Sequence, residues 1–357
     1  MYLTNLTLTH FKNHTKGTFV FSPGLNGLTG LNGVGKTNVL EAIYVLCMGR
    51  SYSGLTDKQL VQHGADFFRL EGQVNRLGEV EKMVIKFPVN QRKVLERNGQ
   101  TLATLSQHIG RYPVVMVAPD DVALVQEGSE DRRRFMDSAL AQTDPAYLQA
   151  LTRYQQALKQ RNALLKQFAD QRRFDPALLE AVDQLLPEPA KVIHQHRKAF
   201  VADLLPLFQL LYHLLSGGRE VADLAYASDL GTSDMETLLK ERLDKDRLLE
   251  RTTAGVHRDD LDFQLDAQAV KKFGSQGQLK SYLLALRLAQ YELLRRNTGV
   301  APILLLDDVF DKLDIRRVRQ LVELLVGRNY GQVFMTDTHR ERLEEVMEGG
   351  FVLELNP

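Results

Sequence analysis

The sequence has very little cysteine, no tryptophan and no net charge. Its 357 residues include a single cysteine, Cys47, so no disulfide can form within the chain. Lysine plus arginine and aspartate plus glutamate both number 45. Because the chain as a whole carries no basic field, a nucleic-acid partner would have to meet a local basic patch.

Long apolar runs are also missing. The most apolar stretch, Leu204 to Leu215, is interrupted by Pro206, Gln209 and His213. It falls short of the roughly 20 residues that a membrane-spanning helix needs. The first residues alternate apolar and polar side chains and lack the charged-then-apolar pattern of a secretory signal. We therefore expect a cytoplasmic protein with no membrane partner.

The two ends of the chain share an α/β pattern that the middle lacks. Short alternating or apolar runs over residues 1–37 and 67–105 predict strands, and Asn98-Gly99 predicts a two-residue hairpin turn between two of them. After residue 253 the sequence again alternates helix-like and strand-like segments, including an apolar strand at 303–306.

The middle, residues 130 to about 250, is rich in Leu, Ala, Gln and Arg and favours helices. Leu151, Leu158 and Leu165 are spaced by seven, although Arg161 interrupts the seam. About three heptads give roughly 30 Å of helix. We therefore expect an α/β fold with an antiparallel β subdomain and an inserted, mostly helical second domain. The predicted first domain comprises 1–120 plus 253–357, and the insertion 121–252.

A phosphate-binding loop is the most specific motif. The spacing G-x-x-x-x-G-K-T is met by Gly30-Leu31-Asn32-Gly33-Val34-Gly35-Lys36-Thr37, and Asn38 follows at the start of an apolar helix. Such a loop wraps backbone N–H groups around phosphate oxygens, while the helix N-terminus faces the same anion. Lys36 would reach the β- and γ-phosphates, and the Thr37 hydroxyl would bind a metal. The motif predicts ATP and Mg²⁺ as cofactors.

Two aspartates end the apolar strand at 303–306. Ligands of α/β sheets bind at the carboxyl ends of strands, where Asp307 is placed to hold Mg²⁺. Asp308 follows, and we expect its carboxylate to orient or deprotonate the attacking water. A second metal-site acid without a catalytic role is the alternative for Asp308.

A second candidate anion cradle is Ser275-Gln276-Gly277-Gln278, where a serine hydroxyl and a glycine N–H precede a predicted helix. One loop already surrounds the triphosphate, so a second cradle suggests a head-to-tail pair of chains. Each ATP would then lie between one chain's phosphate loop and Ser275, Gly277 and Gln278 of the partner subunit. The plain alternative is that Ser275 simply caps a helix.

In this order, the three motifs resemble the ABC-type ATPase heads of SMC-like DNA repair proteins, and more narrowly the bacterial RecF family. The resemblance covers nearly the whole chain. It includes the stretches His10 to Asn13, Gly30 to Glu41 and Gly255 to Asp260, and the strand aspartates followed by Asp311, Asp314, Arg316 and Arg317. Gln62 matches a Q-loop glutamine and is a further catalytic candidate, with a surface polar residue as the alternative. No switch histidine is assigned within Thr336 to His339.

The resemblance implies a function that the motifs alone do not. RecF-like proteins bind DNA at gaps, act with RecO and RecR, and help to load RecA onto single strands covered by SSB, in recombinational repair, replication restart and SOS induction. They are slow, DNA-stimulated ATPases in which ATP acts mainly as a homodimerisation switch. Two alternatives are a nucleotide-gated protein scaffold with negligible hydrolysis and a transporter ATPase subunit.

DNA contacts are the least specified part of the site. The candidates are the basic clusters Arg132-Arg133-Arg134 and Lys271-Lys272, each of which could bind phosphates or be an ordinary solvated face. The chain lacks a stacking-aromatic pattern, and it has too few heptads for long SMC-type arms. We therefore expect sequence-independent backbone contact with duplex DNA or a junction at a gap.

Overall fold

The computed structural model describes residues 1–308, 315–347 and 349–355, with only the backbone described for 315–317. The chain divides into two compact units. Unit 1 contains Met1–Asp121, Leu214–Gly217 and Lys280–Pro357; unit 2 contains Val122–His213 and Gly218–Leu279. The division differs from the sequence-based one chiefly at residues 253–279, which belong to unit 2, and also at Asp121 and Leu214–Gly217, which belong to unit 1.

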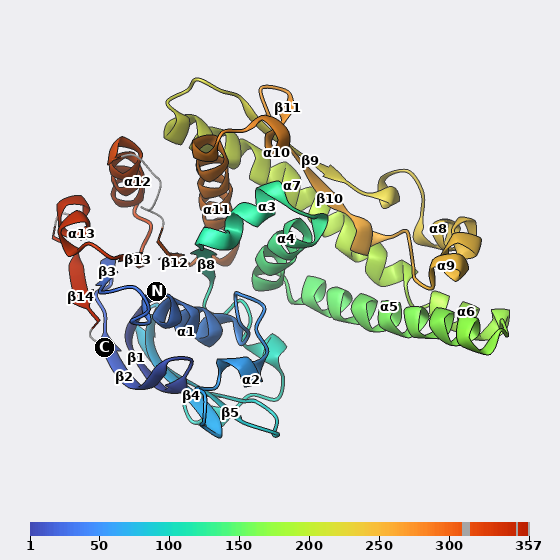
Figure 1. Cartoon of the computed structure of the whole chain (residues 1–357), viewed down its shortest axis with the longest axis horizontal. Helices are drawn as coiled ribbons and strands as arrows, with labels where there is room; N and C mark the ends of the chain where they lie inside the picture. The colour runs from blue at the N-terminus through green and yellow to red at the C-terminus, as the bar shows by residue number, and fades with distance from the viewer. Residues whose placement is uncertain (309–314, 348, 356–357) are drawn as a thin grey trace. The chain divides into compact units, whose positions relative to one another are not determined.

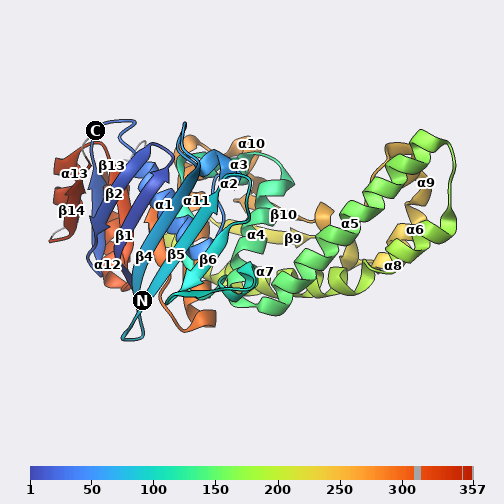
Figure 2. The same ribbon diagram turned by 90° about the horizontal axis from the view of Figure 1, so that it is seen from below.

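Unit 1 contains two sheets. The antiparallel sheet has the order β2-β1-β4-β5-β6-β7, and the parallel sheet has the order β14-β3-β13-β12-β8. Figure 2 shows the antiparallel strands side by side. The strands of the first sheet are β1 (Tyr2–Phe11), β2 (His14–Val20), β4 (Phe67–Arg76), β5 (Glu79–Pro88), β6 (Val94–Arg97) and β7 (Gln100–Thr101). Those of the second are β3 (Leu25–Thr29), β8 (Val114–Val117), β12 (Ile303–Leu306), β13 (Val333–Asp337) and β14 (Phe351–Glu354).

Helix α1 (Lys36–Met48) lies between the two sheets and contacts strands of both. Every residue from Val39 to Met48 is buried, and all of them except Glu41 are apolar, as expected of a helix enclosed on all sides. The remaining helices of unit 1 are α2 (Asp57–Leu60), α12 (Ile315–Gly327), α13 (Arg340–Val346) and most of α11 (Gln276–Thr298). They are visible in Figure 1.

The hairpin predicted at Asn98-Gly99 is confirmed. Asn98 and Gly99 have φ angles of 51° and 79°, the two positive values that a type I′ turn requires. The strand predicted at 303–306 and the helix predicted after the glycine loop are also present. Strand β3 precedes the loop directly, which gives the strand–loop–helix context that the motif requires.

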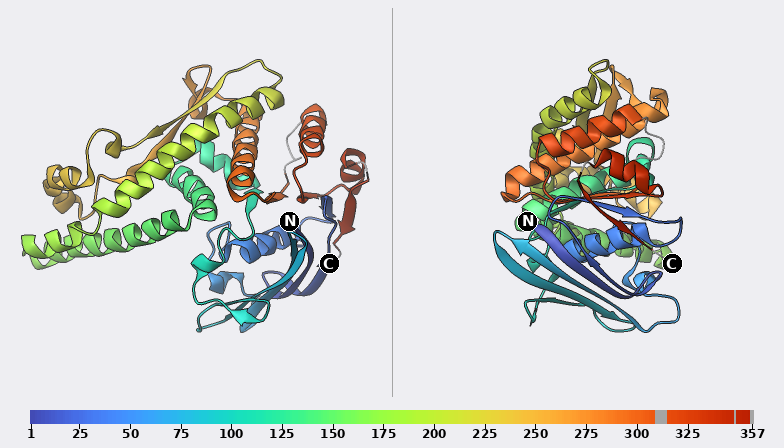
Figure 3. Two further views of the ribbon diagram at one scale, coloured as in Figure 1. Left: turned by 180° about the vertical axis from the view of Figure 1, so that it is seen from behind. Right: turned by 90° about the vertical axis from the view of Figure 1, so that its left-hand side faces the viewer.

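Unit 2 is built on long helices and a small antiparallel sheet of order β11-β10-β9. Figure 3 shows α5 and α7 as the longest of these helices. The strands are β9 (Ala222–Ala227), β10 (Asp260–Leu265) and β11 (Gln268–Ala269). The helices are α3 (Val122–Gln126), α4 (Ser129–Thr143), α5 (Pro145–Gln171), α6 (Pro176–Asp183), α7 (Pro187–Ser216), α8 (Met235–Glu241), α9 (Leu243–Leu249) and α10 (Val270–Phe273).

Strand β9 lies in a region that the composition favoured as helical. It pairs along its length with β10, from Ala222 opposite Leu265 to Ala227 opposite Asp260. This long-range pairing ties residues after 253 to unit 2 and explains where the two domain divisions differ.

Two arginines are fully enclosed in unit 2. Arg161 is 0% exposed and pairs with Asp183 and Asp246, both at 2.6 Å. Arg197 is 2% exposed and pairs with Asp259 at 2.6 Å and Asp137 at 2.8 Å. Arg161 therefore interrupts the leucine seam because it carries a buried ion-pair network that joins segments far apart in sequence.

One segment, Pro176–Ser216, is long and apolar enough to cross a membrane by length and composition alone. Core helices of soluble proteins pass the same test, and 39% of its most apolar window is buried within the protein. Leu204, Phe208 and Leu211 of α7 are 0% exposed. The stretch Leu204 to Leu215, which the sequence suggested is too short to span a membrane, lies within this longer helical segment.

Candidate nucleotide site

The glycine loop joins the buried strand β3 to the N-terminus of α1. Gly30 and Gly35 have φ angles of 143° and 107°. A Cβ atom on Gly30 would lie 2.5 Å from the Leu355 carbonyl oxygen, and one on Gly35 would lie 2.4 Å from His14 Nε2. Both positions therefore require glycine. The side chain of Leu31, also in the loop, is exposed. The first N–H groups of α1 lack helical partners and suit an anion.

Two side chains that motif spacing did not single out support this loop. Asn13 donates from Nδ2 to the Gly33 carbonyl at 3.2 Å and accepts from Asn38 Nδ2 at 2.6 Å. His14 Nε2 lies 3.2 Å from the Gly35 carbonyl oxygen. Asn13 belongs to a stretch that carried the family resemblance, and only the fold shows that it holds the loop.

The predicted catalytic residues Lys36 and Gln62 lie at this loop. Lys36 Nζ donates to the carbonyl oxygens of Gly30 and Leu31 at 2.6 and 3.0 Å, so the ammonium group lies over the loop. Gln62 Nε2 donates to Thr15 Oγ1 at 2.9 Å and lies 3.5 Å from the Asn13 carbonyl oxygen. Gln62 is thus linked through Asn13 to the same loop.

The strand that ends at Asp307 brings this carboxylate to Thr37. Thr37 Oγ1 donates to Asp307 Oδ1 at 3.1 Å, and Thr336 Oγ1 donates to the same oxygen at 2.8 Å. The Asp308 N–H donates to Thr336 Oγ1 at 2.7 Å, and Asp308 has a φ of 48°. Strands β3, β13 and β12 are parallel neighbours, so their carboxyl ends gather these side chains at one edge.

The electrostatics of Asp307 favour a bound cation. Burial raises the pKa of the Asp307 carboxyl above its ordinary value, and the neighbouring Asp308 charge acts in the same direction, while Thr336, Thr37 and Lys36 lower it. A cation would offset that cost of burying a carboxylate. Among the described residues, no group of three or more His, Cys, Asp or Glu side chains could hold a metal. A hydroxyl and one carboxylate fit Mg²⁺ that takes its other ligands from phosphates and water.

A further buried carboxylate shapes the segment after α1. Glu41 is 0% exposed and accepts from Ser51 Oγ at 2.5 Å and from the Tyr52 N–H at 3.1 Å. The Tyr52 hydroxyl in turn donates to Asp121 at 2.5 Å. Glu41 ends a stretch that carried the family resemblance, and only the fold shows that its carboxylate holds the segment after α1.

The Ser275 segment lies in unit 2 and starts helix α11. The Ser275 N–H donates to Gln278 Oε1 at 2.6 Å, and the Gln278 N–H donates to Ser275 Oγ at 3.3 Å, which is a reciprocal capping box. Gln278 Nε2 also donates to Glu220 Oε1 at 2.7 Å. Ser275 therefore caps α11 within its own chain. Its side chain is also exposed at the helix N-terminus.

The basic candidates divide by exposure. Arg132 is 5% exposed, and its guanidinium group donates to both Asp260 carboxylate oxygens at 2.5 and 3.1 Å. A buried guanidinium group paired with Asp260 makes Arg132 a weaker candidate for a DNA contact than the exposed lysines. Arg133 is half-buried and donates to the Asp259 carbonyl at 2.8 Å. Arg134 is exposed and paired with Glu130, whereas Lys271 and Lys272 are exposed with no ion pair among the described residues.

The segment after β13 carries an exposed histidine. His339 Nδ1 lies 2.9 Å from Thr338 Oγ1, and its backbone N–H donates to the buried Asp337 at 2.8 Å. Asp311 and Asp314, which carried part of the family resemblance, lie outside the described residues, as do the side chains of Arg316 and Arg317.

Comparison with known proteins places this geometry in a family. The family described as RecF/RecN/SMC N terminal domain matches residues 2–353. The DNA replication and repair protein RecF of Flavobacterium johnsoniae is 44% identical over 98% of this chain and 97% of its own length. The protein of the same description from Cytophaga hutchinsonii is 42% identical over 96% of this chain and 90% of its own.

Solved structures agree. Two structures described as the recombination mediator protein RecF in the RecFOR pathway, one with ATPrS and one with ATP, match with TM-scores of 0.90 and 0.88 at 28% and 30% identity. They cover 99% and 95% of this chain and 96% and 92% of their own. The Smc head domain of Pyrococcus furiosus, at 17% identity and a TM-score of 0.57, shares the fold over 99% of this chain and 93% of its own. This chain therefore belongs to the RecF family and has the fold of an ABC-type ATPase head.

Proposed function

We propose that this chain is an ATP-dependent DNA-binding protein of recombinational repair and replication restart, in which ATP joins two copies that clamp DNA. The observation that carries the proposal is the hydrogen bond between Thr37 and Asp307, which unites the phosphate loop and the strand aspartate in one site. The RecF structures described with ATP and ATPrS in the RecFOR pathway support a nucleotide-dependent mediator role.

In this proposal ATP lies on Gly30 to Asn38, and Lys36 pairs with its β- and γ-phosphates. Thr37 and Asp307 would hold Mg²⁺, which would neutralise charge on the phosphate oxygens. Asp308 would orient or deprotonate the attacking water, and Gln62 is a further candidate to position it. Ser275, Gly277 and Gln278 of the partner subunit complete the site, so that hydrolysis opens the dimer.

The wider role follows the family. The dimer would bind duplex DNA or a single/double-strand junction at gaps without reading sequence, and act with RecO and RecR to load RecA onto SSB-coated strands, supporting SOS induction. The location would be cytoplasmic, with no membrane partner. A slow, DNA-stimulated ATPase is the expected activity.

A direct test measures molar mass by light scattering with no nucleotide, with ADP, with ATP and with ATP plus gapped DNA. We expect the mass to double only with ATP, and ATP turnover to rise when gapped DNA is added. A monomer under all four conditions would contradict the proposal.

The second candidate function is a nucleotide-gated scaffold with negligible hydrolysis. It is favoured by Asp308, because an aspartate side chain is shorter than the glutamate common at this position and would be a less effective base. The Asp308 N–H also donates a hydrogen bond to Thr336 Oγ1. ATP-dependent dimers without measurable turnover, with or without gapped DNA, would select it. The transporter subunit is not favoured, since the chain matches RecF proteins over nearly its whole length.

A further inference from the structure

A hollow of about 470 Å³ lies at the end of unit 2 where α5 stops and α9 packs against it. Helices α5, α6 and α9 meet at this end in Figures 1 and 2. The hollow is formed by the last turns of α5, the loop after it and α9. None of its residues belongs to the nucleotide site.

Three arginines surround this hollow: Arg172, Arg173 and Arg247. Arg172 and Arg173 are exposed, and neither has an ion pair among the described residues. The only carboxylate in the lining is that of Asp244, which lies 3.9 Å from Arg247 with its side chain 99% exposed. The rim is therefore strongly cationic, with guanidinium donors left for a carboxylate.

The floor of the hollow is apolar. Leu165 and Phe168 are 1% and 8% exposed and form a small core at this end of the unit, against which Phe174 packs. The rings of Phe168 and Phe174 lie edge to face with centroids 5.5 Å apart. On the rim, Leu248 is 80% exposed. The site thus offers an apolar surface inside a cationic border.

The backbone presents one of the arginines at a position that favours glycine. Arg172 caps α5 with a φ of 52°, a left-handed conformation that glycine adopts without strain. Its N–H donates to the Ala169 carbonyl at 3.2 Å, and the next N–H, of Arg173, donates to Phe168 at 3.2 Å. This tight turn places two consecutive arginines beside the apolar floor.

We infer that this hollow binds a protein segment in which carboxylates flank an aromatic or branched aliphatic side chain. The apolar side chain would rest on Phe168 and Leu248, and the flanking carboxylates would pair with Arg172 and Arg173. Arg247 stacks on Phe174 with its guanidinium carbon 4.1 Å from the ring centroid, which leaves its edge N–H groups available for a carboxylate.

Nucleic acid fits the same surface less well. A phosphate backbone has no apolar group to cover Leu248 and the floor. The Phe174 ring, which could otherwise stack on a base, already has Arg247 on its face. The arginines are consequently better matched by an acidic segment that also buries an apolar side chain.

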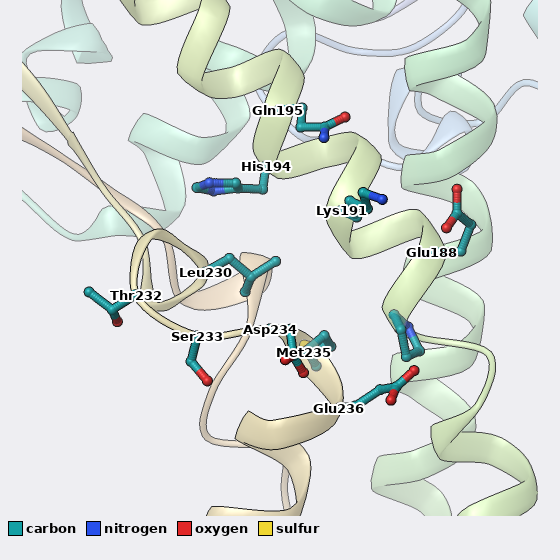
Figure 4. A pocket seen from close by; sticks show the side chains of 11 residues that line it. Glu188, Lys191, His194, Gln195, Leu230, Thr232, Ser233, Asp234, Met235 and Glu236 are labelled. Carbon is teal, nitrogen blue, oxygen red and sulfur yellow. The ribbon is translucent and has the colours of Figure 1, made fainter.

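A larger hollow of unit 2 has the opposite character. Its volume is about 790 Å³, and it places Glu188, Asp234 and Glu236 against a single lysine, Lys191 (Figure 4). Its carboxylates would repel an acidic segment, whereas the arginines at the end of α5 would attract one.

The test uses the full chain without nucleotide and the fluorescein-labelled peptide Glu-Asp-Asp-Phe-Leu-Asp-Glu, with binding followed by anisotropy. We expect saturable binding that weakens at least about tenfold in Arg172→Glu/Arg173→Glu and in Leu248→Asp. The matched variant Arg153→Glu/Lys159→Glu makes the same charge change at exposed positions earlier on α5 and should leave the affinity unchanged. Peptides with amides in place of carboxylates, or serines in place of Phe and Leu, should not bind.

Three outcomes would overturn the inference: no saturable binding of the peptide, equal binding of its amide form, or displacement of the peptide by an oligonucleotide whose own binding the same variants weaken. The last would assign the hollow to DNA. Because all the substituted side chains are exposed, unfolding should not obscure the result, and melting curves check this. Loss of ATP-dependent dimers would leave this test unaffected.

Discussion

Thr37 and Asp307 are 270 residues apart in sequence, yet the Thr37 hydroxyl donates a 3.1 Å hydrogen bond to the Asp307 carboxylate. This contact joins the start of α1 to the end of β12. Thr336 donates to the same carboxylate oxygen from the end of β13. The phosphate loop and the strand aspartate therefore meet at one edge of the parallel sheet, where both could contribute ligands to one metal ion.

Lys36→Met should weaken ATP binding by roughly ten- to a hundredfold, because it removes one charge-assisted contact to phosphate. Its Nζ donates to the carbonyl oxygens of Gly30 and Leu31, both within the loop itself, so thermal stability should change little. Isothermal titration with ATP and a melting curve measure the two effects. Lys58→Met, a lysine of α2, is the control, and equal loss in that variant would show that the loop lysine has no special role.

Asp308→Asn should leave ATP binding and ATP-dependent dimers intact while slowing hydrolysis by about 10²–10⁴-fold, the usual contribution of a general base. Asparagine tolerates the left-handed backbone that Asp308 adopts, with φ of 48°, so the fold should persist. Steady-state phosphate release with gapped DNA provides the measurement. Unchanged turnover would show that Asp308 is not the general base and acts only as a second acid beside the metal.

Ser275→Arg should abolish ATP-dependent dimers without affecting ATP binding, because the bulky cation would occupy the place of the partner's triphosphate. Ser275→Thr is the matched variant, since it keeps a hydroxyl that caps α11 and should keep the dimer. Sedimentation velocity with ATP distinguishes the two. If Ser275→Arg dimerises like the wild type, the cradle is only a helix cap.

The motifs were predictable because each depends on neighbouring residues. The glycine loop, the strand before Asp307 and the Asn98-Gly99 hairpin are local patterns, and the structure confirms all three elements. Strand β9 was missed because its partner β10 begins more than thirty residues later, so nothing nearby distinguishes it from a helix.

Ion pairs were the least predictable feature. Arg132 lies within an exposed-looking run of three arginines, and only the fold reveals that Asp260, 128 residues away, takes its guanidinium group. Arg161 likewise depends on Asp246, 85 residues away. Such pairs leave no local pattern, so basic runs in a sequence are poor guides to nucleic-acid contacts.

His257 should make unit 2 sensitive to mild acid. Its Nδ1 lies 2.7 Å from the Tyr154 hydroxyl and its Nε2 lies 3.0 Å from the Thr252 carbonyl oxygen, and burial lowers the pKa of His257 from 6.5 to about 4. The unfolded histidine takes up a proton first as pH falls. Stability is therefore fully present above about pH 6.5 and declines towards pH 4, by up to about 3 kcal/mol.

Urea unfolding at several pH values between 7 and 4 measures this decline. His257→Gln removes the titrating group, so its free energy of unfolding should fall less steeply with acid than that of the wild type. His63→Gln, at an exposed histidine, serves as the control and should follow the wild type. Parallel curves for all three proteins would exclude His257 as the source of the acid sensitivity.

Lys271→Glu/Lys272→Glu should weaken DNA binding without lowering stability, because both side chains are exposed and have no ion pair among the described residues. If each lysine contacts one phosphate, the slope of log affinity against log salt should fall by about 2. Arg132→Met should instead destabilise unit 2 by about 1–3 kcal/mol, since it removes a buried guanidinium group that donates to two backbone carbonyls and to Asp260, whose side chain is 39% exposed. Anisotropy with gapped DNA at several salt concentrations and thermal unfolding separate these two effects.

The control for this comparison is Lys240→Glu/Lys245→Glu, which makes the same change in net charge at exposed lysines of α8 and α9. A general charge effect would weaken DNA binding equally in both double variants. A contact at Lys271 and Lys272 predicts a larger loss, and a smaller salt slope, only in the first. If Arg132→Met melts like the wild type but loses DNA binding, Arg132 contacts DNA after all and its pair with Asp260 is dispensable for the fold.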